Sequence, residues 1–483
     1  MGLKQNIILN YINTLTSIIF PIITFPYAAR ILSPAGIGTV DFLDSIINYI
    51  ILFTNLGIPF YGIKEIAKFR DNIKLRNKKT IELLCLNIIL AICGYIVVYI
   101  ISVYSAKVNK NIDIFYILSL AIFFNAIGAQ WFYQAIEDFK FITIRAVIIR
   151  IVFMVYLFLF VRTSADVIFY AIFLVGSTVS NYLINFIHLR KFLLGTKIRL
   201  KELNIRQHLT PTLKVFFMFV FVSVYLYLNT ILLGFLQDDK SVGYYTAGIK
   251  IIRVINTLVT SVGAVVVPRC SNLLHSNNQE DFNNLITKSY HFMMAMSLPI
   301  SAILILLATP ITTILCGKEF SNSISVLIIT SPTVIFVTLS NIIGMQILFP
   351  MNKEKIIILA TGIASFVNIL VNIILVPLIA EKGAAYAIAL AELSIFITEY
   401  KIGKKYIPFK LITKNIKQYF IGTCVMSLGV VIIMPITNNI FNEFILCGGV
   451  GLILYTGYLY LTKESITMEL FTKCSSIIKK KNI

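Results

Sequence analysis

The feature that most constrains this chain is a series of apolar runs, each about twenty residues long, that fills almost its whole length. A helix of that length matches the hydrocarbon core of a bilayer. Since 58% of the residues are hydrophobic and only 13% are charged, water cannot be the solvent for most of the chain. Hydrocarbon offers the backbone no hydrogen bonds, so each run must be helical. The sequence therefore predicts an all-α polytopic membrane protein with about 14 transmembrane helices.

The net charge of +20 indicates membrane topology rather than nucleic-acid binding, because the basic residues are unevenly distributed. If the N-terminus is cytoplasmic, 31 of the 42 Lys and Arg residues lie on cytoplasmic segments and 7 lie on outside loops. Membrane proteins keep Lys and Arg preferentially on the cytoplasmic side. We therefore expect a multi-pass protein with both termini in the cytoplasm, in contact with membrane lipids and with no nucleic acid.

The predicted spans form two groups of six, followed by two more. Asn125 to Gln130 in the fourth span matches Asn341 to Gln346 in the tenth, and Gly38 before the second span matches Gly243 before the eighth. These matches predict two pseudo-symmetric six-helix lobes around a central cavity. We expect an N-terminal six-helix lobe (1–195), a cytoplasmic interfacial connector (196–214), a C-terminal six-helix lobe (215–405), and helices 13 and 14 with a basic cytoplasmic tail (406–483).

The predicted span from Gly243 to Pro268 carries two cations, Lys250 and Arg253. Each costs roughly 2.5–3.5 kcal/mol at a helix centre, so the helix can insert but will not turn them towards lipid. Thr257 continues their stripe at helical spacing. We interpret this stripe as a wall of the central cavity. The alternative is an ion pair between helices that binds no ligand.

A second polar stripe lies in the predicted second span, where Asp41, Asp44 and Asn48 recur at helical spacing. Under the internal repeat, Asp44 lies level with Ile249 and the next residue with Lys250, so we expect the acidic and basic stripes to face each other. Arg30, at the outer end of the first span, is either a ligand contact or an interfacial anchor. Glu392, deep in the twelfth span, could couple transport to a proton gradient or form a buried structural hydrogen bond.

The sequence shows no pattern that is typical of a metal site, a disulfide framework or a nucleotide-binding loop. Its seven cysteines are scattered without CxxC spacing, and its four histidines form no cluster. No GxxxxGK[ST] motif is present. We expect no cofactor and no enzymatic activity.

Three motifs resemble those of the bacterial oligosaccharide flippases, the polysaccharide transporter branch of the multidrug/oligosaccharidyl-lipid/polysaccharide (MOP) exporter superfamily. They are the run from Tyr27 to Gly38, the run from Gln130 to Lys140, and Asn368 with Asn372 and Pro377 ahead of Gly383. The resemblance implies a location in the bacterial cytoplasmic (inner) membrane. It also implies an undecaprenyl-diphosphate-linked glycan as substrate, flipped to the outer leaflet for O-antigen or capsule biosynthesis.

The resemblance also suggests roles for the polar residues. A diphosphate that crosses hydrocarbon needs cations in place of its water shell, and Lys and Arg suit its oxygens. We expect the substrate-binding residues to be Arg30, Lys250, Arg253, Asn48 and Thr257, and the gate or coupling residues to be Asp41, Asp44 and Glu392. Further partners would be an H⁺ or Na⁺ coupling ion, a glycan polymerase and glycosyltransferases.

Two other functions fit parts of the pattern. A cation-coupled multidrug exporter of the same superfamily would share the fold, although the basic stripe argues against it. A membrane glycan polymerase would usually carry a large outer loop with polar catalytic residues, whereas every predicted outer connection here is short.

Overall fold

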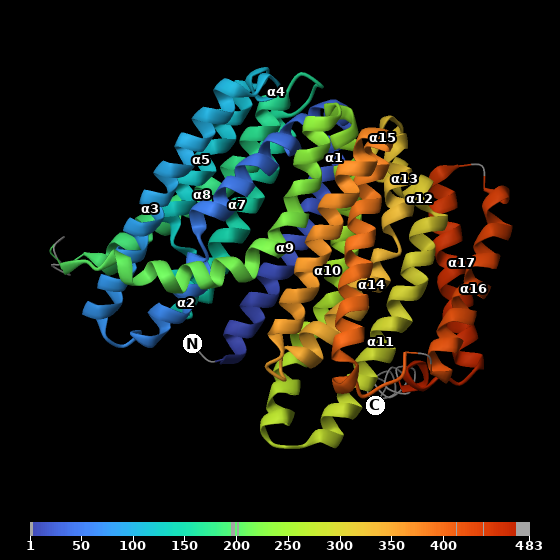
Figure 1. Ribbon diagram of the computed structural model, residues 1–483. Helices are drawn as coiled ribbons and strands as arrows, with labels where there is room; N and C mark the ends of the chain where they lie inside the picture. The colour runs from blue at the N-terminus through green and yellow to red at the C-terminus, as the bar shows by residue number, and fades with distance from the viewer. Residues whose placement is uncertain (1–2, 195–198, 200–201, 412, 438, 470–483) are drawn as a thin grey trace, which may run out of the picture. The chain divides into compact units, whose positions relative to one another are not determined.

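The computed structural model describes all residues except 1–2, 195–198, 200–201, 412, 438 and 470–483. Within these described residues the regular elements are helices, with no strand. The chain divides into two compact units, residues 1–243 and 244–483. Figure 1 shows the first unit in blue to green and the second in green to red. The four predicted domains stay a prediction, and the predicted basic tail lies outside the described residues from 470 onwards.

The described part of the first unit contains ten helical elements. They are α1 (Leu3–Asn55), α2 (Ile58–Lys68), α3 (Ile73–Tyr104), α4 (Ala106–Asn109), α5 (Ile112–Gly128), α6 (Gln130–Ala135), α7 (Phe139–Phe160), α8 (Val167–Leu193), the 3₁₀ turn η2 (Ile205–His208) and α9 (Leu209–Leu236). Helix α10 (Asp239–His275) begins in this unit and continues into the second.

The described part of the second unit continues with eleven further elements. They are α11 (Gln279–Leu306), α12 (Ala308–Cys316), η3 (Lys318–Phe320), α13 (Ser321–Thr330), α14 (Thr333–Ser340), the π-helix η4 (Asn341–Leu348), α15 (Glu354–Gly403), η5 (Lys404–Tyr406), α16 (Lys414–Ile433) and α17 (Ile440–Leu461), with the turn η6 (Met434–Ile436) between the last two. Its largest core lies along α11 and includes buried side chains of α16 and α17.

Helix α3 shows the inverted polarity of a membrane helix. Its polar residues Thr80, Asn87 and Ser102 are at most 2% exposed, whereas Ile92 and Ile96 are 58% and 56% exposed. In water this arrangement would be costly, because buried polar groups need partners and exposed apolar groups gain nothing. A bilayer around the helix accounts for the exposed apolar side chains. The buried hydroxyls of Thr80 and Ser102 donate to backbone carbonyls of their own helix. The fold is therefore that of a membrane protein, as predicted.

In the described part of the chain, ten helices are long and apolar enough to cross a membrane, and eleven if the bent pair 318–330 and 333–348 is one span. Two of these helices are far longer than a bilayer is thick. Helix α1 has 53 residues and α15 has 50, and each covers two of the predicted spans. The number of membrane crossings, about fourteen, stays a prediction.

The backbone of α1 breaks at Ser33. Pro21 and Pro26 lie within helical backbone, whereas Ser33 has φ 62° and ψ 166°. Ser33 precedes Pro34, whose ring disfavours the helical conformation of the residue before it and which donates no backbone hydrogen bond. The segment after Pro34 therefore takes a new direction.

The connector expected over 196–214 is described only in part, because residues 195–198 and 200–201 lie outside the described residues. Its second half docks on α3 through Glu82, which is fully buried. His208 Nε2 lies 2.9 Å from Glu82 Oε2, and Lys79 Nζ lies 3.2 Å from the same oxygen. The Tyr61 hydroxyl lies 2.9 Å from His208 Nδ1. A neutral imidazole that donates from Nε2 satisfies both contacts, and burial lowers the pKa of His208 although Glu82 opposes the shift.

Candidate functional site

The structure distributes the predicted site residues over both units. Arg30, Asp41, Asp44 and Asn48 belong to α1 in the first unit. Lys250, Arg253 and Thr257 belong to α10, and Glu392 to α15, in the second unit. The facing of the acidic and basic stripes stays a prediction.

On α1 the structure brings Asp44 and Asn48 into direct contact. The amide Nδ2 of Asn48 donates to the Asp44 carboxylate at 2.8 Å and to the Asp44 carbonyl at 2.9 Å. Asp41, one turn earlier, is 8% exposed. Asp41 is therefore buried in the unit, whereas Asp44 and Asn48 are half-buried, and Asn48 orients the carboxylate of Asp44.

The break at Ser33 separates Arg30 from this stripe. Arg30 lies in the segment of α1 before the break and is exposed, whereas the carboxylates lie in the segment after it. The two groups therefore lie on differently directed segments of the same helix. The role of Arg30 in substrate binding stays a prediction.

The basic stripe lies on a continuous stretch of α10. Lys250 is half-buried, and Arg253 and Thr257 are exposed on the unit. The Thr257 hydroxyl donates to the Arg253 carbonyl at 2.8 Å, so its hydrogen bond is made within the helix. Steps of three and four residues place all three side chains on one face of α10. This face combines two cations with hydroxyl groups, which is the chemistry that binds phosphate oxygens.

The glycines matched in the sequence, Gly38 and Gly243, lie in direct contact where α1 crosses the first turns of α10. A Cβ atom on Gly38 would lie 1.7 Å from the Asp239 carbonyl oxygen, and one on Gly243 would lie 1.9 Å from the Pro34 carbonyl oxygen. No real side chain tolerates such distances. The close approach of these backbones therefore requires glycine at both positions.

A polar clip, defined as Thr39, Lys107 and Asp239, closes this crossing. The Thr39 hydroxyl donates to Asp239 Oδ2 at 2.8 Å, and Lys107 Nζ lies 3.3 Å from Asp239 Oδ1. Lys107 also donates to the carbonyls of Gly234 and Gln237. Sequence reasoning missed all three residues as site residues. The matched glycines were the only signal that pointed to this level of the chain.

In the second unit the structure adds a carboxylate that the sequence did not single out. Glu399 lies seven residues after Glu392 on α15 and is 1% exposed. Ser340 donates to Glu399 Oε2 at 2.8 Å, and a Cβ atom on Gly344 would lie 2.6 Å from Glu399 Oε1. Glu399 was missed because it lies near the predicted end of its span, where a charge usually reaches water.

Both copies of the matched motif mark an irregularity in a helix. In the first, α5 ends at Gly128 and Ala129 has φ 39° before α6 begins. In the second, the chain forms the π-helix η4. Gly128 packs against Tyr182 on α8, as Gly344 packs against Glu399 on α15. The matched residues therefore have matching structural roles within their own units.

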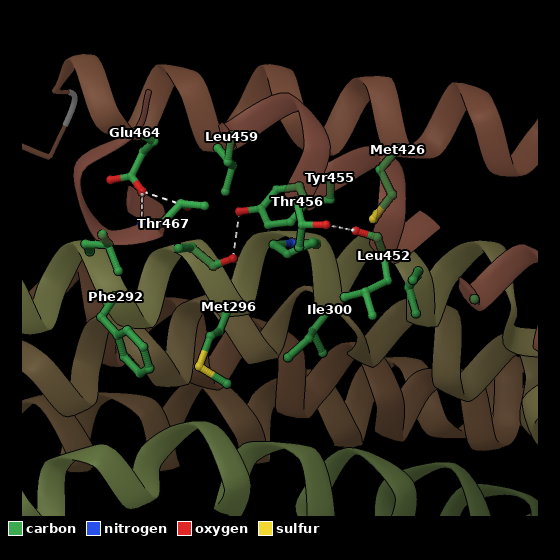
Figure 2. A pocket seen from close by; sticks show the side chains of 15 residues that line it. Phe292, Met296, Ile300, Met426, Leu452, Tyr455, Thr456, Leu459, Glu464 and Thr467 are labelled. Carbon is green, nitrogen blue, oxygen red and sulfur yellow. Dashed lines mark hydrogen bonds between the residues drawn. The ribbon is translucent and has the colours of Figure 1, made fainter. Parts of the chain in front are cut away.

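An apolar groove of about 520 Å³ lies in the second unit, between α11 and α17. Figure 2 shows Met296 and Ile300 of α11 on one side and Leu452 and Tyr455 of α17 on the other. Glu464 closes one end. None of the predicted site residues lines this groove. Among the described residues, no three His, Cys, Asp or Glu side chains gather to hold a metal ion.

Comparison with protein families agrees with this architecture. The family model described as polysaccharide biosynthesis protein matches residues 3–274, which is more than half of the chain. A second family model, MatE, matches residues 215–374.

Individual relatives are transporters and flippases by name. The chain is 27% identical over 397 residues to a candidate O-antigen transporter of Escherichia coli (strain K12), a match that covers 81% of this chain and 94% of the relative. It is 25% identical over 167 residues to Agl15 of Haloferax volcanii, a candidate flippase of low-salt glycan biosynthesis, with 35% of each chain covered. Among solved structures, the inward closed conformation of the lipid II flippase MurJ is similar, with a TM-score of 0.73 and 17% identity over 95% of this chain and 99% of that chain. This last likeness shows the fold.

Proposed function

Since the chain belongs to the polysaccharide biosynthesis protein family, we propose that it flips undecaprenyl-diphosphate-linked oligosaccharide repeat units from the cytoplasmic to the outer leaflet. The glycan would serve cell-surface polysaccharide such as O-antigen or capsule. The protein would lie in the bacterial cytoplasmic membrane with both termini in the cytoplasm, and glycosyltransferases and a polymerase would act before and after it.

The observation that carries this proposal is the pair of cations on one face of the membrane helix α10. Lys250 and Arg253 lie among apolar residues, in a helix whose apolar window is long enough to span the bilayer. Cations in such a place need an anion or water to offset their desolvation. The diphosphate of a lipid-linked sugar is an anion that must itself cross hydrocarbon. Lys250, Arg253, Arg30, Asn48 and Thr257 would bind the substrate.

We assign the acidic stripe to gating. When the substrate is absent, Asp41 or Asp44 would compete for Lys250; when the diphosphate binds Lys250, the carboxylates would be released. A ligand shifts a conformational balance only through its different affinity for the two states, and this exchange provides such a difference. The contact between Gly38 and Gly243 would open in the same transition. Glu392 is our candidate for coupling to H⁺ or Na⁺.

The test is glycan export in cells by the double variant Lys250→Ala, Arg253→Ala. We expect export to be lost while the protein remains in the membrane, because removing a cation eases insertion. Arg269→Ala is the matched control, since it removes a cation from the same helix outside the stripe, and export should persist. Full export by the double variant at normal protein levels would contradict the binding role.

The second candidate function is a cation-coupled multidrug exporter, and the MatE match over residues 215–374 favours it. The two functions differ in their substrate. Restoration of surface glycan in a strain that lacks its own flippase supports the first function. Protection of a drug-sensitive strain from cationic compounds, without restored glycan, would support the second.

A further inference from the structure

Arg145 of α7 is a buried cation whose hydrogen bonds are incomplete. Arg145 is only 6% exposed. Its Nε donates to Asn181 Oδ1 at 3.1 Å, and its Nη1 is buried without a partner. Within the described residues, no carboxylate forms an ion pair with it. A buried guanidinium without a counter-charge is costly, since burial removes its water shell.

Other unpartnered polar atoms lie on the facing helix. Asn181, Asn185 and His188 share one face of α8, because they are spaced by four and three residues. Asn185 is 0% exposed, and both its side-chain nitrogen and its oxygen lack partners, as does Nδ1 of His188. The ring of Phe141 connects the two helices. Its centroid lies 5.3 Å from the Arg145 guanidinium carbon and 4.2 Å from the His188 ring centroid.

The surrounding charges do not neutralise Arg145. Arg150, on the same helix, already donates from Nη1 to Asn13 and Thr16. Lys191 adds a further positive charge near His188, and Asp138 adds a negative charge near the same ring. The Asp138 side chain accepts from the backbone N–H of Phe141 at 3.2 Å and so caps α7. The net charge of the groups around Arg145 is therefore positive.

Water molecules could fill the missing hydrogen bonds but not the missing charge. We propose that Arg145, Asn185 and His188 bind a small inorganic anion of the size of chloride inside the first unit. Arg145 Nη1 and Asn185 Nδ2 would donate to it, and His188 would donate in the tautomer that carries its proton on Nδ1. This site stabilises the α7–α8 pair, and it shares no residue with the stripe on α10.

The test is the thermal stability of the purified full-length protein in sodium chloride and in sodium gluconate at equal ionic strength. We expect a saturable rise in Tm of about 2–4 °C in chloride alone. Arg145→Gln should abolish that rise. Arg150→Gln is the matched control, because it removes a neighbouring half-buried cation whose Nη1 already donates to Asn13 and Thr16, and it should retain the rise.

Equal Tm values in the two salts, or an equal rise in Arg145→Gln, would overturn the proposal and leave a water-filled site. If Arg145→Gln does not accumulate, crystals of the unaltered protein in bromide provide an independent measurement. An anomalous peak within hydrogen-bond distance of Arg145 supports the site. Ordered water there, without an anomalous peak, overturns it.

Discussion

Gly38 and Gly243 show how single residues set the distance between two helices. Each glycine lacks a side chain, and backbone atoms of the other helix occupy the space that a Cβ atom would need. Gly38 lies one residue before Thr39 of the polar clip, and Gly243 lies four residues after Asp239. The glycine contact and the clip therefore form one structural unit, in which close backbone approach brings the hydroxyl, the ammonium and the carboxylate within bonding distance.

We expect Gly38→Ala to force this crossing apart, because the new methyl group would meet backbone atoms, which cannot rotate away. Overpacking typically lowers the free energy of unfolding by about 1–3 kcal/mol. We expect a loss near the upper end of this range, because the methyl group would meet backbone atoms. Gly362→Ala is the matched control. Gly362 also lies inside a helix but has no atom within 4 Å of its Cβ position, so alanine should stabilise the protein by about 0.5–1 kcal/mol. The free energy of unfolding in detergent checks both, and equal effects would contradict the contact.

At the scale of elements, the hairpin of α16 and α17 depends on a carboxylate that follows it. Glu464 is 1% exposed. Its Oε1 accepts from the Tyr419 hydroxyl of α16 at 2.7 Å, and its Oε2 accepts from the Thr467 N–H at 2.9 Å. Burial alone would raise the pKa of Glu464. The hydrogen bonds from Thr467 and Tyr419 outweigh burial and hold the pKa below its ordinary value.

This lowered pKa predicts a pH dependence. A carboxylate whose pKa is lower in the folded state contributes stability above its unfolded pKa of about 4.3 and loses it as the pH falls through the folded pKa. We expect Glu464→Gln to be less stable at pH 7 by about 1–3 kcal/mol and to lose less stability below pH 4.3. Glu280→Gln, at an exposed position on α11, should change stability by less than about 0.5 kcal/mol. The measurement is unfolding free energy against pH, and parallel curves for Glu464→Gln and the unaltered protein would contradict the role.

At the scale of the whole molecule, the distribution of cations relates the chain to its membrane. Of the basic residues, 31 lie on segments that the predicted topology places in the cytoplasm and 7 on predicted outside loops. The long helices α1 and α15 each contain two predicted spans. If one span did not cross the membrane, every loop after it would lie on the opposite side from the predicted one. The topology is therefore testable at few positions.

We expect cysteines placed at Lys74 and Lys405 to react only from the cytoplasmic side, and cysteines at Lys240 and Lys382 only from outside. The physical reason is the preference for Lys and Arg on the cytoplasmic side. The measurement is labelling of intact cells with a membrane-impermeant thiol reagent, in a background that lacks the seven natural cysteines. Labelling of positions 74 and 240 from the same side would refute the fourteen-span topology.

What the sequence determined by itself follows from interactions that are local along the chain. An apolar run of bilayer length is sufficient to specify a membrane helix, so the helical class and the membrane setting could be read from residue types. Lys250, Arg253 and Thr257 could likewise be placed on one face of α10, because helical spacing is a local property. The family motifs also lie within short stretches.

The tertiary structure alone decided which polar groups meet. Asp239 bonds Thr39 across 200 residues, His208 lies against Glu82 across 126, and Tyr419 bonds Glu464 across 45. No local pattern encodes such pairs, because any buried donor can satisfy any acceptor that packing brings near it. The break at Ser33, the burial of Glu399 and the incomplete bonds of Arg145 follow in the same way. Each depends on the neighbour that the packed helices supply, and that neighbour is distant in the sequence.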